Sequence, residues 1–199
     1  KESMKIAFFD FRARKVIAKI QRDNRRSIRA FINNGFKIEK VSTTYRTFSL
    51  TMDRYLMSIN GDTVIATTIY VTETDVERLE KILESVLHSG EVSEKTILDL
   101  EHEISRATIV DPKQISRDII TMNSRVLLHL DGNEMEVSLV YPQDADPGKN
   151  KLSVFSPIGT AILGYSEGSV IEWELASGVA EIHIEKVLYQ PEAAGDYHM

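Results

Sequence analysis

The chain has 199 residues, of which 42% are hydrophobic and 27% are charged, with a formal net charge of −6. This composition is typical of a globular protein with a sizeable core and argues against wholesale disorder. The absence of cysteine excludes disulfides, thiol catalysis and cysteine-type zinc sites. No apolar run is long enough to cross a bilayer and no signal-peptide pattern opens the chain, so we expect a cytoplasmic protein without a membrane partner.

Charge is distributed unevenly along the chain. Residues 1–56 contain 14 Lys and Arg against 5 Asp and Glu, a net charge of +9. Residues 57–199 contain 10 against 25, a net charge of −15. Such an asymmetry suggests separate origins or separate partners for the two parts. The turn signal Asn60-Gly61 places a domain boundary between them.

The basic N-terminal segment, residues 1–62, has no assigned fold from its sequence pattern. Apolar residues in 10–34 fall near helical spacing, which predicts a helix that Asn33-Asn34-Gly35 would end. Its arginines either contact nucleic-acid phosphates or form a solvated face, and charge runs favour the second reading. Residues 36–58 are ambiguous between strand and irregular chain, and Met52 and Met57 are candidate starts of a shorter protein. The four candidate phosphate-contacting residues are Arg22, Arg25, Arg26 and Arg29.

Two matched apolar seams follow a predicted strand at Thr63–Tyr70. In each seam apolar residues recur at intervals of three, four and three, which predicts two helices joined as an antiparallel hairpin. Thr72 or Thr74 can cap the first helix, Gly90 can end it and Ser93 can cap the second. Asp111-Pro112 ends the hairpin. The seams consist of Val76, Leu79, Leu83 and Val86, and of Ile97, Leu100, Ile104 and Ala107.

The remainder of the chain is predicted to be mostly β. Alternating apolar residues flank the turn signal Asp131-Gly132-Asn133, and further strands are expected at Val170–Leu175 and around Ala180–Leu188. Between them, a short strand runs into one helical turn that Ser156 caps, Pro157 begins and Gly164 stops. The five histidines are scattered without ligand spacing. A helical hairpin followed by a small antiparallel sheet with one short helix is an α+β fold.

Four sequence motifs together resemble one protein family. They are Asn123-Ser124-Arg125-Val126, Leu139-Val140-Tyr141-Pro142, the Ser-Pro-Ile-Gly-x-Ala-x-Leu-Gly-x-x-x-Gly segment at 156–168 and the terminal Tyr189-Gln190-Pro191-Glu192-Ala193-Ala194-Gly195-Asp196-Tyr197. This combination resembles the Rnk family, short relatives of the GreA/GreB transcript-cleavage factors. The resemblance covers about residues 69–197 and does not extend to the basic segment.

The resemblance implies a short antiparallel coiled coil at 63–110 and an FKBP-like antiparallel sheet domain at 111–199. It also implies docking on RNA polymerase near the secondary channel, with the coiled coil pointing into that channel. The implied docking residues are Phe155, Ser156, Pro157 and Ile158. Gre factors often carry an acidic residue where this chain has Phe155, so an apolar contact is expected there. The alternative is that Pro157 and Ile158, like Leu163, only form core and corner.

The hairpin tip decides between two functions. Gre factors carry two acids there that bring Mg²⁺ to the polymerase active site, and this chain has Glu91 and Glu94 at the same spacing, with Ser93 between them. Arms of about 15 residues span roughly 22 Å, about half of a Gre hairpin, so the acids should stop short of the active site. They would then only place negative charge at a helix start.

The sequence therefore predicts a non-enzymatic regulator that binds RNA polymerase, blocks the secondary channel and competes with Gre-type factors. No catalytic residue, metal site or cofactor is expected. Residues 63–199 are not expected to bind nucleic acid directly. For the basic segment, nucleic-acid binding is kept as an alternative. One alternative is a short-armed transcript-cleavage factor acting through Glu91 and Glu94. Another is an FKBP-type prolyl isomerase, for which Trp173 alone is a thin basis.

Overall fold

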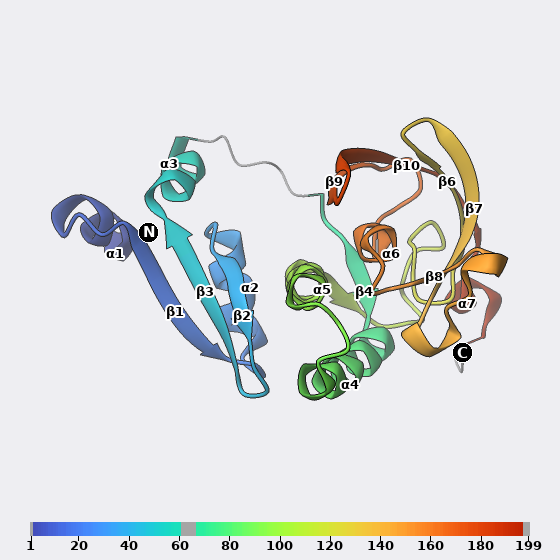
Figure 1. Ribbon diagram of the computed structural model, residues 1–199, viewed down its shortest axis with the longest axis horizontal. Helices are drawn as coiled ribbons and strands as arrows, with labels where there is room; N and C mark the ends of the chain where they lie inside the picture. Colours follow the sequence, from blue (N-terminus) through green and yellow to red (C-terminus); the bar gives the residue numbers. More distant parts are fainter. Residues whose placement is uncertain (1, 61–66, 197–199) are drawn as a thin grey trace. The chain divides into compact units, whose positions relative to one another are not determined.

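The computed structural model describes residues 2–60 and 67–196, and the chain divides into two compact units, Lys1–Thr67 and Thr68–Met199 (Figure 1). Residues 63–66 of the strand predicted at Thr63–Tyr70 lie outside the described residues, as does Tyr197 of the terminal motif, and within 67–70 only Tyr70 belongs to a strand. Among helices in the described part of the chain, none combines the length and apolar character that spanning a bilayer demands.

The first unit is a three-stranded antiparallel sheet with helices. Its elements are α1 (Glu2–Lys5), the π-helix η1 (Ile6–Asp10), β1 (Lys15–Gln21), α2 (Arg25–Asn33), β2 (Lys37–Val41), β3 (Tyr45–Thr51) and α3 (Met52–Asn60). The strand order is β1-β3-β2. The helix predicted across 10–34 is therefore wrong in its first half. Val16, Ala18 and Ile20 are its more buried residues and alternate with exposed neighbours, which is the period of a strand.

Aromatic packing and one buried arginine hold this unit together. The rings of Phe31 on α2 and Phe48 on β3 lie 5.9 Å apart. Arg46 is 2% exposed and its Nη1 donates to the Arg22 carbonyl at 2.7 Å. Arg22 itself is buried. It therefore belongs to the interior of this unit, which argues against its predicted alternative role as a surface contact to phosphate.

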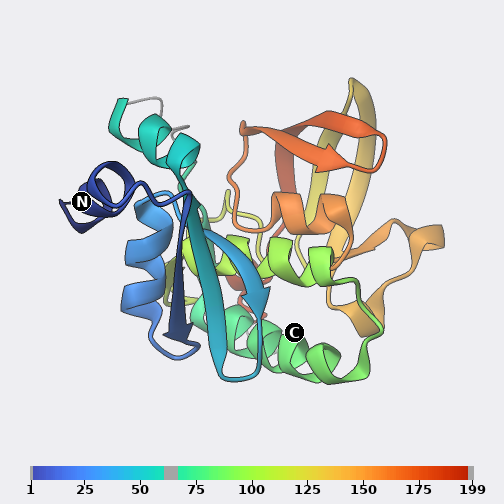
Figure 2. The same cartoon turned by 60° about the vertical axis from the view of Figure 1, so that its left-hand side comes forward.

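The second unit begins with the helical hairpin (Figure 2). Its elements are β4 (Tyr70–Thr72), α4 (Glu73–Ser89), α5 (Glu94–Arg106) and β5 (Thr108–Val110). Thr72 caps α4, Gly90 ends it in the left-handed region at φ 70°, and Ser93 caps α5, so the predicted hairpin and its caps are confirmed. The parallel pairing of β4 with β5, which closes the hairpin at its base, is missing from the prediction.

The sheet domain follows the hairpin. It contains β6 (Arg125–Leu130), β7 (Asn133–Val140), β8 (Lys151–Ser153), α6 (Pro157–Ile162), β9 (Val170–Leu175), β10 (Gly178–Tyr189) and α7 (Pro191–Ala194). Two 3₁₀ turns, η2 (Pro142–Asp144) and η3 (Pro147–Lys149), precede β8. The strand order is β8-β7-β6-β10-β9. The expected α+β arrangement is confirmed, but the sheet is mixed because those two turns redirect the chain and β8 pairs parallel to β7.

Helix α6 joins the two parts of this unit. It contacts α5 of the hairpin as well as β8 and β9 of the sheet domain (Figure 2). Its residues from Gly159 to Ile162 are buried, and so are the Leu163 and Gly164 that follow. Leu163 is therefore core, as its predicted alternative role required. Trp173 lies on β9 and is half-buried between the exposed Glu172 and Glu174.

Candidate functional site

The Ser-Pro corner is built by local hydrogen bonds between β8 and α6. The Ser156 Oγ accepts from the Gly159 N–H at 3.0 Å, and Pro157 occupies the first helical turn. The Thr160 hydroxyl donates to the Val154 carbonyl at 2.7 Å. A Cβ added to Gly159 would lie 2.1 Å from the Ser153 carbonyl oxygen, so only glycine fits there. The corner is consequently fixed in shape.

The four predicted docking residues lie together on this corner. Pro157 is exposed, while Phe155, Ser156 and Ile158 are half-buried. Exposure ends abruptly at Gly159, which begins a run of seven consecutive buried residues. The corner thus presents a small, largely apolar surface on a rigid base. Part of the Ile158 side chain packs in the domain and part reaches the surface, and its docking role stays a prediction.

The end of α6 is tied to the base of the hairpin. Gly164 adopts φ 80° as predicted, its N–H donates to the Ile120 carbonyl at 2.9 Å and its own carbonyl accepts from the Tyr70 N–H at 2.9 Å. A Cβ at this position would approach the Tyr70 carbonyl oxygen to 2.8 Å. The backbones of α6 and β4 therefore touch, and β4 leads directly into α4. The same backbone contact therefore positions both the Ser-Pro corner and the start of the hairpin.

The hairpin tip carries the two acids that the sequence singled out. Glu91, Ser93 and Glu94 are all exposed, beyond the far end of the 17-residue α4. The Ser93 Oγ accepts from the Thr96 N–H at 3.1 Å, and Glu94 lies in the first turn of α5. At 1.5 Å per residue, α4 extends about 25 Å and the 13-residue α5 about 20 Å. Neither the tip nor the corner gathers three potential metal ligands among the described residues.

The hairpin base contains a buried carboxylate that no pattern in the sequence indicates. Asp75, in the first turn of α4, is 6% exposed. It accepts from the Tyr141 hydroxyl at 2.8 Å and from the Met122 N–H at 3.2 Å. Burial raises the pKa of Asp75, and the hydrogen bonds from Tyr141 and Met122 oppose that shift. The tyrosine of the Val-Tyr-Pro motif thus locks the hairpin to the sheet domain.

The terminal motif stabilises the loop that contains Met122, whose N–H donates to Asp75. The Gln190 amide donates to the Ser116 and Ile119 carbonyls, both at 2.8 Å. Glu192 accepts from the Thr121 hydroxyl at 2.7 Å, and Thr121 directly precedes Met122. Burial raises the pKa of Glu192. The motif therefore clamps the loop whose backbone N–H reaches Asp75.

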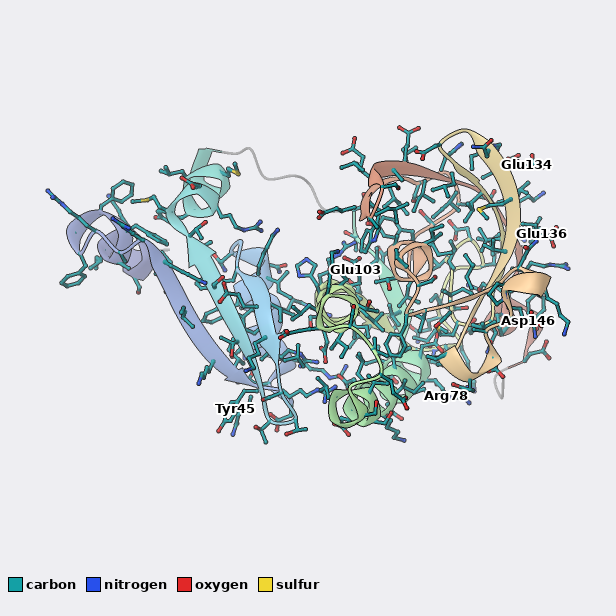
Figure 3. The ribbon with its side chains drawn as sticks, in the orientation of Figure 1. Tyr45, Arg78, Glu103, Glu134, Glu136 and Asp146 are labelled. Atoms are coloured by element: carbon teal, nitrogen blue, oxygen red, sulfur yellow. The ribbon has the colours of Figure 1, made fainter. Side chains whose placement is uncertain are left out.

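A second tie joins the end of α5 to the sheet domain through Glu103, which Figure 3 labels on that helix, and its partner Arg106. Arg106 pairs with Glu103 and donates to the Tyr165 hydroxyl at 2.8 Å. The side chains of Arg106 and Glu103 are 11% and 4% exposed. Burial raises the pKa of Glu103, although its bond to Arg106 works in the opposite direction. Both helices of the hairpin are therefore anchored by buried polar contacts.

Comparison with known proteins agrees with this architecture. Residues 67–110 match the Rnk N-terminus model and residues 114–189 match the model of the GreA/GreB transcription elongation factor C-terminal domain. The regulator of nucleoside diphosphate kinase from Escherichia coli K12 is 40% identical over 134 residues, which cover 65% of this chain and 96% of that protein. The chain belongs to the Rnk family of GreA/GreB relatives.

Two further comparisons show that this Rnk family chain is similar to transcription elongation factors. GreA of Chlorobium phaeobacteroides BS1 is 32% identical over 154 residues, covering 67% of this chain and 94% of that protein. A solved GreA/GreB structure from Nitrosomonas europaea is 38% identical, covers 61% of this chain and 98% of its own, and superimposes with a TM-score of 0.50. Apart from Thr67, both family-model matches fall within the second unit, so the family assignment rests on that unit.

Proposed function

We propose that the chain is a transcription regulator that docks on RNA polymerase near its secondary channel and competes with Gre-type factors without stimulating transcript cleavage. Docking is assigned to the Ser-Pro corner of the second unit. The hairpin occupies the mouth of the channel. The two acids at its tip stay outside the catalytic centre.

The length of the hairpin is the observation that carries this proposal. Arms of 17 and 13 residues span about 25 and 20 Å, close to the reach expected from the sequence. Delivery of a metal ion to a distant active site depends on reach. A hairpin of this length can obstruct a channel mouth but cannot extend to chemistry deep within it.

Three features of the second unit support docking through the corner. Phe155 and Ile158 offer apolar surface beside the exposed Pro157, and desolvated apolar anchors dominate binding at protein interfaces. The corner is rigid, so little conformational entropy is lost on binding. The acidic character of residues 57–199 suits a basic protein surface better than a nucleic acid.

A competition experiment tests the proposal directly. Labelled GreA bound to RNA polymerase is titrated with the full chain, which should displace it. Phe155→Ala should weaken displacement about ten-fold, the loss of roughly 1.4 kcal/mol of binding energy. Leu188→Ala removes a comparable apolar side chain that is 38% exposed on β10 and should displace GreA as the unsubstituted chain does. Absence of any polymerase binding would refute the proposal.

A transcript-cleavage assay on backtracked complexes separates the two Gre-related functions. We expect no stimulation of cleavage by the full chain. The exposed position and spacing of Glu91 and Glu94 keep a short-armed cleavage factor as the second candidate. Cleavage that disappears in the Glu91→Ala/Glu94→Ala double variant would establish that candidate and remove the first.

A further inference from the structure

We propose that the outer face of the five-stranded sheet holds a binding site for a divalent transition-metal ion of the zinc class, formed by His129, Glu134 and Glu185. Each residue comes from a different strand, and the strands β7, β6 and β10 are adjacent in the sheet. One ligand atom of each side chain lies within 4.8 Å of the others. The site is independent of the proposed polymerase docking.

Strand register brings the three ligands together. His129 on β6 lies directly opposite Glu134 on β7, so the two side chains project from the same face of the sheet. A β-bulge in β10 between Ile184 and Lys186 leaves Glu185 as the extra residue. Bulges redirect side chains, and here the Glu185 Oε2 lies 2.6 Å from the His129 Nε2. The sequence offered no signal for this cluster, because its members are separated by 5 and 51 residues and only register unites them.

The distances suit a single small cation. Donor atoms at about 2.0–2.2 Å from zinc in tetrahedral geometry lie roughly 3.3 Å apart. Ligand atoms up to 4.8 Å apart must therefore close by at most about 1.5 Å, and the His129–Glu185 pair at 2.6 Å must open by about 0.7 Å, which partly exposed glutamate side chains can do by rotation. His129 and Glu185 have side chains that are 29% and 45% exposed, so the ion keeps access to solvent. A water molecule would complete the coordination.

The donor set selects the class of metal. Mg²⁺ and Ca²⁺ prefer sites built entirely from oxygen, whereas an imidazole with two carboxylates suits zinc and its neighbours. The surrounding charge favours any cation. Glu181 and Glu172 are paired directly across β10 and β9, and this like-charge pair adds negative charge to the same sheet. Figure 3 shows Glu134 and Glu136 on the same outer side of β7.

Two residues provide matched controls. Glu136 lies two residues from Glu134 on the same face, and its carboxylate pairs with Arg125 at 3.5 Å. His183 lies opposite His129 with its ring centroid 6.0 Å away, outside the cluster of ligand atoms. Glu136→Gln and His183→Asn therefore remove the same chemical groups from the same face without removing a ligand.

Zinc titration of the untagged full chain by calorimetry tests the proposal, with thermal unfolding recorded with and without zinc. We expect one zinc ion per chain and a higher melting temperature. Affinity should fall at least about ten-fold in His129→Asn, Glu134→Gln and Glu185→Gln but not in the two controls. Variants whose metal-free melting temperature matches the unsubstituted chain show that folding is intact. No saturable binding, equal loss in ligand and control variants, or equal binding of Mg²⁺ would overturn the proposal.

Discussion

Removing the Asp75 carboxylate should loosen the hairpin from the sheet domain. In Asp75→Ala the Tyr141 hydroxyl and the Met122 N–H both lose their acceptor within a buried site. A buried polar group left without a partner costs about 1–3 kcal/mol. Part of that cost is offset because the buried carboxylate also disappears, so we expect a net loss of about 2–3 kcal/mol in the free energy of unfolding.

A double-mutant cycle with Tyr141→Phe isolates the contact itself. Tyr141→Phe alone should cost about 1–1.5 kcal/mol, because Asp75 keeps the Met122 N–H. Once Asp75 is gone, the tyrosine hydroxyl no longer has this bond to lose. The double variant should therefore lose about 1 kcal/mol less than the sum of the single variants, a coupling energy typical of residues in direct contact.

The pH dependence of Asp75→Asn has a definite sign. Because burial raises the pKa of Asp75, the folded state favours its protonated form. The stabilisation linked to that proton is complete below the unfolded-state pKa, near 3.9, and is lost as pH rises through the folded-state pKa. Asparagine cannot ionise and escapes this loss. The stability of Asp75→Asn relative to the unsubstituted chain should therefore increase from pH 4 to pH 7.

Urea unfolding followed by fluorescence at pH 4, 5.5 and 7 measures these quantities. Glu103 and Glu192, whose pKa values are also raised by burial, are present in every variant and largely cancel in the differences. Strict additivity in the cycle would show that the Asp75–Tyr141 bond contributes nothing. A stability difference that falls with rising pH would refute the assigned direction of the Asp75 pKa shift.

Three further substitutions test the corner and the second tie. Gly159→Ala should cost about 3 kcal/mol because its Cβ would collide with the Ser153 carbonyl, and calorimetry showing a change under about 0.5 kcal/mol would contradict this. Ser156→Ala should cost about 1 kcal/mol through loss of the helix cap, measured by urea unfolding against the unsubstituted chain. Arg106→Met should lower the free energy of unfolding by about 3 kcal/mol at pH 7, because Glu103 is left buried without its cation. The loss should shrink at acid pH as Glu103 protonates. A loss that does not change with pH would argue against that cause.

The hairpin and the corner were predictable because local rules decide both. Thr72, Ser93 and Ser156 each cap a helix through a side-chain oxygen, as their residue types favour. Gly90 and Gly164 adopt the left-handed conformations that their positions demand. Heptad-like spacing then fixed which faces of α4 and α5 are buried. These signals lie within a few residues of the structure that they specify.

What escaped prediction depends on partners far away in the sequence. Asp75 bonds to Tyr141, 66 residues further along the chain, and no local pattern marks a carboxylate as buried. In the first unit, Val16, Ile17 and Ile20 also fit a helix, and β1 forms because β3 supplies its partner 24–36 residues away. Likewise, only the turns η2 and η3 decide that β8 runs parallel to β7.

The length of the hairpin determines where its tip lies only if the hairpin is held rigidly on the sheet domain. Asp75 fixes the start of α4, Arg106 fixes the end of α5, and Gly164 joins the backbone of β4 to the end of α6. With both ends of the hairpin held by buried contacts, docking at the corner would also set the direction of the tip. A loose hairpin of the same length would exclude a competitor only part of the time. The buried polar contacts at the hairpin base therefore matter to the proposed blocking role as much as the docking residues do.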